Sequence, residues 1–136
     1  MGKRYTEEER QAVDAKRELL AEAARIMEEQ RPADIDKAAR ILSTYSRRNI
    51  ALILIQAEQR GQQFPQEVAG FHAWRAAGRI VRKGSAGYFI YAPVIKEDAQ
   101  GDLVRKGYRV THVFDVADTD PIAVDSPATL RELIAS

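Results

Sequence analysis

Cysteine is absent from this sequence, and its absence excludes several kinds of site at once. Without thiols there are no disulfides and no thiolate metal centres, and such a chain fits a reducing cytoplasm. Histidine is scarce too, because only His72 and His112 occur and neither belongs to an HExxH motif. A zinc site would therefore need distant carboxylates. We expect no catalytic residue, no metal and no cofactor, and we do not predict an enzyme.

Long hydrophobic runs are also missing. The longest apolar run, Ile50–Ile55, is far too short to cross a bilayer, and the N-terminus lacks the apolar core of a signal peptide. The sequence has no GxSxG motif and no glycine-rich loop that ends in Lys-Ser or Lys-Thr. We therefore expect no membrane partner and a cytoplasmic location.

The composition that remains is that of an ordinary globular protein with unevenly placed charge. The 136 residues are 45% hydrophobic and 30% charged, enough for one domain with a buried core. The net charge is only +1, but residues 1–39 carry 8 basic and 10 acidic side chains, residues 40–112 carry 12 and 5, and residues 113–136 carry 1 and 5. No acidic residue occurs from Val68 to Lys96. A basic segment thus lies between two acidic ones.

Helical periodicity marks the first half of the chain. Thr6 has capping-box spacing to Glu9, and a helix is expected within residues 1–33. A second helix should begin after Asp34 or Asp36 and end at Gly61, with Ser46 as the cap of a new helix if the chain breaks there. Residues 71–78 are typical of a short helix that ends at a glycine.

Extended patterns follow the helices. Residues 79–83 and 88–95 are typical of strands joined by a turn at 84–87, residues 96–107 of an exposed connection, and residues 108–116 of a third strand. The order of elements predicts an α+β fold. In it, two N-terminal helices and a short third helix pack on a small antiparallel sheet made of a hairpin plus one strand.

The segment "GRIVRKGSAGYFIYAP" (78–93) is a candidate for binding a phosphate backbone. Proteins that bind single strands combine basic groups for the phosphates with aromatic faces for the bases. Because side chains alternate along a strand, Tyr88 and Tyr91 lie on opposite faces, and only one face can meet a ligand. The alternative is a plain solvated hairpin whose glycines serve the turn.

Two further features are open to more than one interpretation. In "YSRRN" (45–49), Asn49 interrupts an apolar helical stripe, either as a satisfied buried group or as part of a groove. Trp74 fits the core better than a ligand surface, because tryptophan buries so much area.

Three segments taken together resemble one known family. They are "YSRRNIALILIQAEQRG" (45–61), "VAGFHAWRAAGRIVRKGSAGYFIYAPV" (68–94) and "YRVTHVFDVADTD" (108–120). They are similar to the N-terminal single-stranded-DNA-binding domain of ArdC-type antirestriction proteins, which is also found in TraC-type plasmid primases. The family's pattern is matched in order by Tyr45, Ser46 and Asn49, by Gly70, Phe71 and Trp74, by Gly78, Val81, Arg82, Lys83, Gly84 and Gly87, by Ile90 and Pro93, and by Val113, Phe114, Asp115 and Thr119.

The resemblance covers about residues 37–120 of a single predicted domain, 1–136, and leaves residues 121–136 as a C-terminal extension with a helical turn or two around 127–134. Asp118 stands where the family usually has glutamine. Relatives commonly continue into a metallopeptidase-like domain with HExxH, or are attached to a primase domain. This chain has no HExxH, so no peptidase activity is implied.

The resemblance implies sequence-tolerant binding of single-stranded DNA, with duplex DNA left open, in an antirestriction, conjugation, plasmid or phage setting. Basic side chains would neutralise phosphates, glycines would admit the backbone closely, and aromatic rings would stack bases. The predicted DNA-binding residues are Tyr45, Ser46, Arg47, Arg48, Asn49, Trp74, Arg79, Arg82, Lys83, Gly84, Gly87 and Tyr88.

Two alternatives remain at this point. The domain could be a protein-interaction module that inhibits a restriction enzyme directly, with the acidic ends as the contact surface. Less favoured is a metal-dependent DNA-processing enzyme that uses Asp115, Asp118 and Asp120, since acids that end a strand are more often simply solvated.

Overall fold

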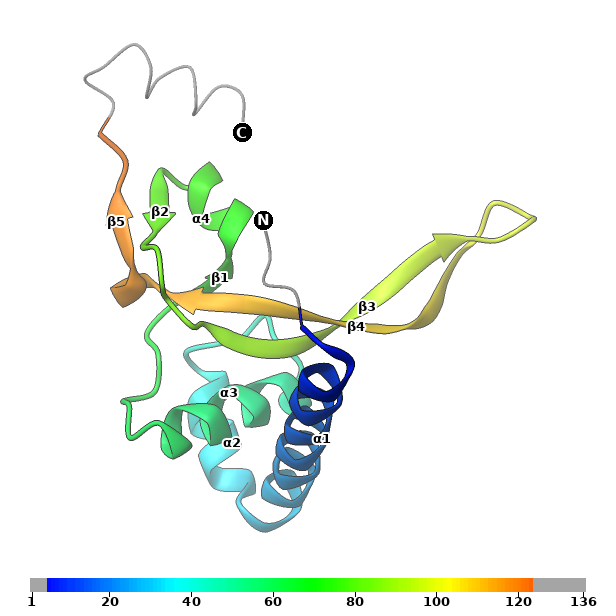
Figure 1. Ribbon diagram of the computed structural model, residues 1–136, viewed down its shortest axis with the longest axis horizontal. Coiled ribbons are helices and arrows are strands. Elements are labelled where there is room, and N and C mark those ends of the chain that lie inside the picture. The colour runs from blue at the N-terminus through cyan, green and yellow to red at the C-terminus, as the bar shows by residue number, and fades with distance from the viewer. Residues whose placement is uncertain (1–4, 124–136) are drawn as a thin grey trace. The chain divides into compact units, whose positions relative to one another are not determined.

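The structure is a computed structural model that describes residues 5–123, and these form two compact units that divide after Phe64. The first unit is helical and the second holds the strands (Figure 1). Each unit is described by itself below. The α+β class expected from the sequence is confirmed, whereas the prediction of a single domain stays a prediction.

The first unit contains α1 (Glu7–Gln30), α2 (Pro32–Ala39) and α3 (Arg47–Gln59). The Oγ1 atom of Thr6 accepts a hydrogen bond from the Glu9 N–H at 3.1 Å, so the predicted cap of the first helix is confirmed. Aliphatic side chains fill the interior of this unit. The largest of those with essentially no exposed surface are Ile35, Ile50, Leu52 and Ile53.

The second predicted helix is in fact two helices. It begins at Pro32 rather than after Asp34 or Asp36, because proline lacks the N–H that the first helical position leaves unused. The break at Ser46, foreseen as an alternative, is present: its Oγ accepts from the Asn49 N–H at 3.2 Å and starts α3. Three N-terminal helices therefore replace the two expected.

The second unit has two small antiparallel sheets. One has the order β1–β4–β3, made of β1 (Val68–Gly70), β4 (Leu103–Asp115) and β3 (Tyr88–Glu97). The other pairs β2 (Arg79–Val81) with β5 (Thr119–Pro121). The short helix α4 (Phe71–Ala76) connects β1 to β2, as predicted, and a 3-10 turn (Val116–Asp118) joins β4 to β5.

The hairpin predicted from residues 79–83 and 88–95 is wrong. β2 pairs with β5, in the register Arg79 to Pro121, and β3 pairs with β4. Residues 84–87 do not close a two-strand turn, because the chain passes here from one sheet to the other. Gly84 and Gly87 adopt the positive φ values of this crossing, +89° and +66°.

The exposed connection predicted at residues 96–107 is also wrong over most of its length. β3 continues to Glu97 and β4 starts at Leu103. The turn between them is held by the Asp98 carboxylate, whose Oδ1 accepts from the N–H groups of Gln100 and Asp102, both at 2.9 Å. The result is a long two-stranded ribbon that runs beyond the rest of the second unit (Figure 1).

The helical turn expected around residues 127–134 lies outside the described residues. Among residues 5–123, no helix is both long and apolar enough to span a membrane.

Candidate nucleic-acid interface

Two arginines of the predicted interface are engaged in holding the second unit together. Arg79 donates through Nε to the Thr119 hydroxyl at 2.6 Å and through Nη2 to the Thr119 carbonyl at 3.1 Å. Arg82 donates to the Asp120 carboxylate at 3.0 Å and to the Ala117 carbonyl at 2.5 Å. These bonds tie β2 to the segment that contains β5. A phosphate at either guanidinium would therefore compete with intramolecular acceptors.

Lys83 and Gly84 are placed differently from these arginines. Lys83 is exposed and makes no ion pair with a described residue. Gly84 is exposed as well, and no atom lies within 4 Å of the position that a Cβ would occupy there. This part of the predicted site is accessible to a ligand.

The predicted stacking residues Trp74 and Tyr88 are in the core. Only 4% of Trp74 and 5% of Tyr88 are exposed, and the indole Nε1 donates to the Phe114 carbonyl at 2.8 Å. The core interpretation of Trp74 is thus confirmed. Phe89, on the opposite face of β3, is buried too, so the expectation that one face of this stretch meets a ligand is wrong for residues 88–90. The strand is covered on both faces where it enters the sheet.

Gly87 also serves packing. A Cβ at this position would lie 2.8 Å from the Phe114 ring and 2.8 Å from the Val113 carbonyl oxygen. The missing side chain lets the chain cross closely over β4, and Gly87 is buried there. Its position gives no opening for a phosphate.

The "YSRRN" residues belong to the helical unit. Arg47 donates to the Asp36 carboxylate at 2.7 Å, and Arg48 forms an ion pair with Glu28. Ser46 is the cap of α3, and Asn49 is half-buried beside it. Tyr45 is half-buried, and this burial raises the pKa of its hydroxyl. Because these residues and the basic strand lie in different units, a groove shared by both stays a prediction.

The acidic run at the end of β4 has structural partners. The Oδ1 atom of Asp115 accepts from the backbone N–H groups of Gln66 and Glu67, at 3.1 and 3.3 Å. Asp120 is paired with Arg82. Within residues 5–123, no three His, Cys, Asp or Glu side chains gather in a way that could hold a metal ion. The donor set of the nuclease alternative is therefore not assembled.

The chain matches the model of a known family. The model of the N-terminal domain of anti-restriction factor ArdC matches residues 9–122. The chain belongs to this family. The resemblance inferred from the sequence is confirmed, and the match extends beyond both ends of the segment 37–120.

Among solved structures, this ArdC-type antirestriction domain matches the metal-free crystal structure of the antirestriction protein ArdC from the R388 plasmid. The two are 21% identical with a TM-score of 0.40, and the match covers 57% of this chain and 29% of that chain. The chain thus matches less than a third of that ArdC protein. A comparison with curated proteins gave no match.

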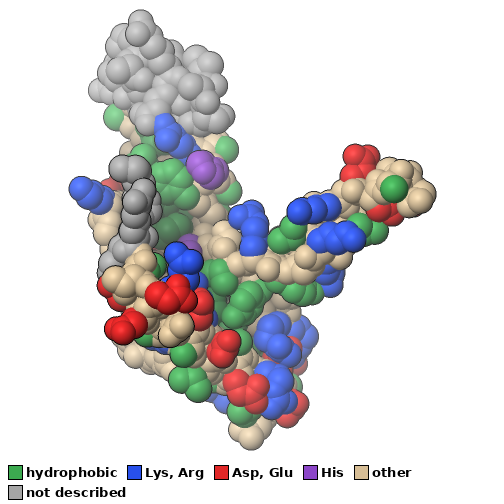
Figure 2. All heavy atoms as spheres, turned by 45° about the vertical axis from the view of Figure 1, so that its right-hand side comes forward, with side chains coloured by type: hydrophobic (Ala, Val, Ile, Leu, Met, Phe, Trp, Pro, Cys, Tyr) green, Lys and Arg blue, Asp and Glu red, His purple; other side chains and the backbone are tan. Residues whose placement is uncertain are grey.

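The ArdC-type domain carries a set of exposed cations that the sequence-based prediction missed. They lie on the distal part of the β3–β4 ribbon, residues 93–109, which we call the arm. Figure 2 shows Lys and Arg side chains along the arm and acidic ones at its end. The basic residues of the arm are Lys96, Arg105, Lys106 and Arg109, all exposed. They were assigned to a loop or left unremarked, although "VRKGYR" concentrates cations around an aromatic residue.

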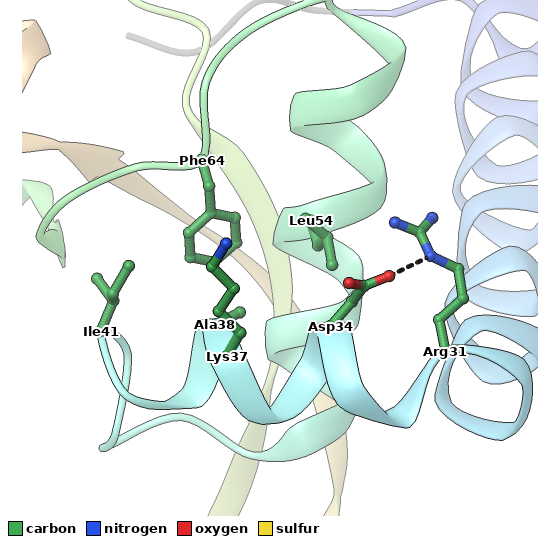
Figure 3. Close-up of a pocket in the computed structure, with 7 residues that line it drawn as sticks. All are labelled: Arg31, Asp34, Lys37, Ala38, Ile41, Leu54 and Phe64. Atoms are coloured by element: carbon green, nitrogen blue, oxygen red, sulfur yellow. Dashed lines mark hydrogen bonds and ion pairs between the residues drawn. The ribbon is translucent and has the colours of Figure 1, made fainter.

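A small pocket lies in the helical unit (Figure 3). Its volume is about 210 Å³, and it is lined by Arg31, Asp34, Lys37, Ala38, Ile41, Leu54 and Phe64. At its rim Arg31 donates to Asp34 at 2.7 Å and reaches Glu58 with two further bonds of 2.7 and 3.0 Å. These bonds raise the pKa of Arg31 and lower that of Glu58. An apolar floor with a paired, charged rim suits one apolar side chain of a protein partner.

Proposed function

We propose that this domain binds single-stranded DNA with little sequence preference, and that it does so in an antirestriction setting such as plasmid transfer or phage infection. The proposal rests on the family and on one observation, the exposed cations of the second unit, most of which lie along the β3–β4 ribbon. Family membership supplies the setting, and the charges supply the affinity.

Several cations of the second unit are exposed, and some of its acids are engaged. Lys83, Lys96 and Lys106, like Arg109, are exposed and make no ion pair with a described residue. By contrast, Asp98 and Asp115 accept backbone N–H groups, and Asp120 is paired with Arg82. Three of these four cations lie on the arm, whose acids are at or beside its turn, so the ribbon itself presents a positive surface. Such a surface attracts a polyanion without reading its sequence.

A titration of labelled oligonucleotide against the whole chain tests this proposal. Fluorescence anisotropy should show binding at low salt, similar Kd values for two unrelated sequences, and a loss of about 0.7 log units of affinity per phosphate contact for each log unit of salt. A duplex of the same sequence measures the preference for single strands. No binding at low salt would overturn the proposal.

A second candidate function follows from the pocket in the helical unit. An exposed Ile41 beside a cavity that fits one apolar side chain favours a direct contact with a protein, such as a restriction enzyme. Ile41→Asp should then abolish co-purification with that enzyme and leave DNA binding unchanged. If the enzyme is still captured, the pocket is not the contact.

A further inference from the structure

The arm is a two-stranded ribbon with no third strand beside it among the described residues. β1 pairs only with the stretch from Val113 to Asp115, so neither strand of the arm has a neighbour other than its partner. Three large apolar side chains of the arm are exposed: Tyr108 by 59%, Ile95 by 51% and Leu103 by 76%. Exposed apolar side chains gathered on one short ribbon are typical of a contact surface.

All three of these side chains lie on one face. Directly opposed residues of an antiparallel pair share a face, and the pairs here are Pro93 with Tyr108, Ile95 with Arg105, and Glu97 with Leu103. We call this the tyrosine face. The other face carries Arg109, opposite Ala92, and Lys96, opposite Val104.

A β-bulge places Arg105 and Tyr108 together. Residues three apart in a regular strand point to opposite faces. The register shifts between Pro93 and Ile95, and Gly107 adopts a φ of +102° at this point. The shift brings Arg105 round to the tyrosine face, because two residues of β4 are accommodated where β3 has one.

The two side chains then contact each other. The Arg105 Cζ lies 5.3 Å from the centre of the Tyr108 ring, and its Nη1 donates to the Tyr108 hydroxyl at 2.7 Å. This contact restrains an aromatic ring that no core surrounds and keeps a cation beside it. A restrained, exposed ring with an adjacent cation suits a base and its phosphate.

The charges of the arm are also separated along its length. Its four basic side chains lie on the ribbon, whereas Glu97, Asp98 and Asp102 are at or beside the turn. Asp98 is occupied by the backbone of the turn. In Figure 2 the cations accordingly follow the ribbon and the acids gather at its end. A polyanion is therefore attracted along the ribbon and repelled from its tip.

We propose that the arm is the principal strand-binding element of this domain: Tyr108 stacks on an unpaired base, Arg105 on the same face neutralises the adjacent phosphate, and Lys96, Lys106 and Arg109 neutralise further phosphates as the strand wraps around the ribbon. The inference rests on the proposed function and identifies the surface that binds the DNA. The ligand class is single-stranded nucleic acid, because only unpaired bases offer a free ring face to an aromatic side chain.

Point variants in the whole chain test the arm. With labelled oligothymidylate, Tyr108→Ala should raise Kd about 5- to 150-fold, as expected for one lost base stack, while Tyr108→Phe keeps binding close to wild type. Lys106→Ala together with Arg109→Ala should reduce the salt slope by about 1.4, or 0.7 for each phosphate contact. Lys16→Ala, an exposed cation of α1, is the matched control that leaves Kd unchanged.

Photo-crosslinking to a bromodeoxyuridine oligonucleotide gives a readout that does not depend on affinity. Mass spectrometry should find the crosslink on the peptide that contains Tyr108. If the arm variants bind DNA as tightly as wild type, or if the crosslink lies on another peptide, the arm is not the binding surface. The proposed function is unaffected by either result. Equal weakening of duplex and single-strand binding by Tyr108→Ala overturns base stacking. Absence of any binding by the wild type overturns both proposals.

Discussion

Arg82 and Asp120 are joined across the smaller sheet, with Nη1 of the guanidinium 3.0 Å from Oδ1 of the carboxylate. The same guanidinium donates to the carbonyls of Ala117 and Thr119. Arg82, which the family pattern places in the basic segment, therefore also connects the end of β2 to the segment that contains β5.

The first prediction separates the structural role of Arg82 from its charge. Arg82→Ala should lower the free energy of unfolding by about 0.5–1.5 kcal/mol, because it removes the bonds to the Asp120 carboxylate and the Ala117 carbonyl. Lys83→Ala removes the same charge and no bond, so its melting temperature should match wild type. Thermal denaturation followed by circular dichroism measures both. Equal melting temperatures for the two variants would show that the Arg82 bonds contribute nothing to stability.

The second prediction compares Gly87, which is closely packed, with Gly84, which has open space around it. Gly87→Ala should destabilise the chain by about 2–4 kcal/mol, because it adds left-handed strain to a collision with the Phe114 ring and the Val113 carbonyl. Gly84→Ala has open space at its Cβ and should cost only the strain, about 1–2 kcal/mol. Urea denaturation distinguishes them. A larger cost at Gly84 would contradict the packing role of Gly87.

Trp74 gives a third prediction, which separates a core role from a binding role. Trp74→Phe keeps an aromatic ring but removes the indole N–H that donates to the Phe114 carbonyl, at a cost of about 0.5–1.5 kcal/mol for the lost hydrogen bond. Because the ring is buried, the Kd for single-stranded DNA, measured below the onset of unfolding, should stay within about twofold of wild type. A large loss of affinity with unchanged stability would show that Trp74 contacts the DNA.

The sequence was sufficient where the signals are local. The hydroxyl of Thr6, the break at Ser46 and the glycine after α4 each act within a few residues, so these three helix boundaries could be predicted. Strand pairing could not be predicted in the same way. β2 pairs with a strand about 40 residues later, and nothing in residues 79–88 encodes that partner.

The candidate site was affected by the same limitation. Arg79 and Arg82 count as free cations in a sequence, and only the distant acceptors at Thr119 and Asp120 show that they are engaged. Conversely, the sequence pattern places Arg105 in a predicted connection and Tyr108 in a predicted strand, so it does not bring the two together. The bulge at Gly107 brings them onto one face, and positional alternation alone would place them on opposite faces.

The last prediction concerns the ion pair between Arg31 and Glu58, which links the start of α2 to the end of α3. The bonds from Arg31 lower the pKa of Glu58 below its usual value of 4.5. A carboxylate with a lowered folded-state pKa contributes stability that is fully present above the unfolded value and lost as the pH falls through the folded value. Both side chains are substantially exposed, so solvent screening limits the contribution to about 0.5–1 kcal/mol.

Glu58→Gln should therefore be less stable than wild type at neutral pH, and the difference should shrink as the pH falls from about 4.5. Urea denaturation at a series of pH values measures this difference directly, and added salt should reduce it. In an Arg31→Gln background the same substitution should show no such pH dependence, because the partner that lowers the pKa is gone. A difference that stays constant through the acid range would mean that Glu58 titrates alike in the folded and unfolded chain.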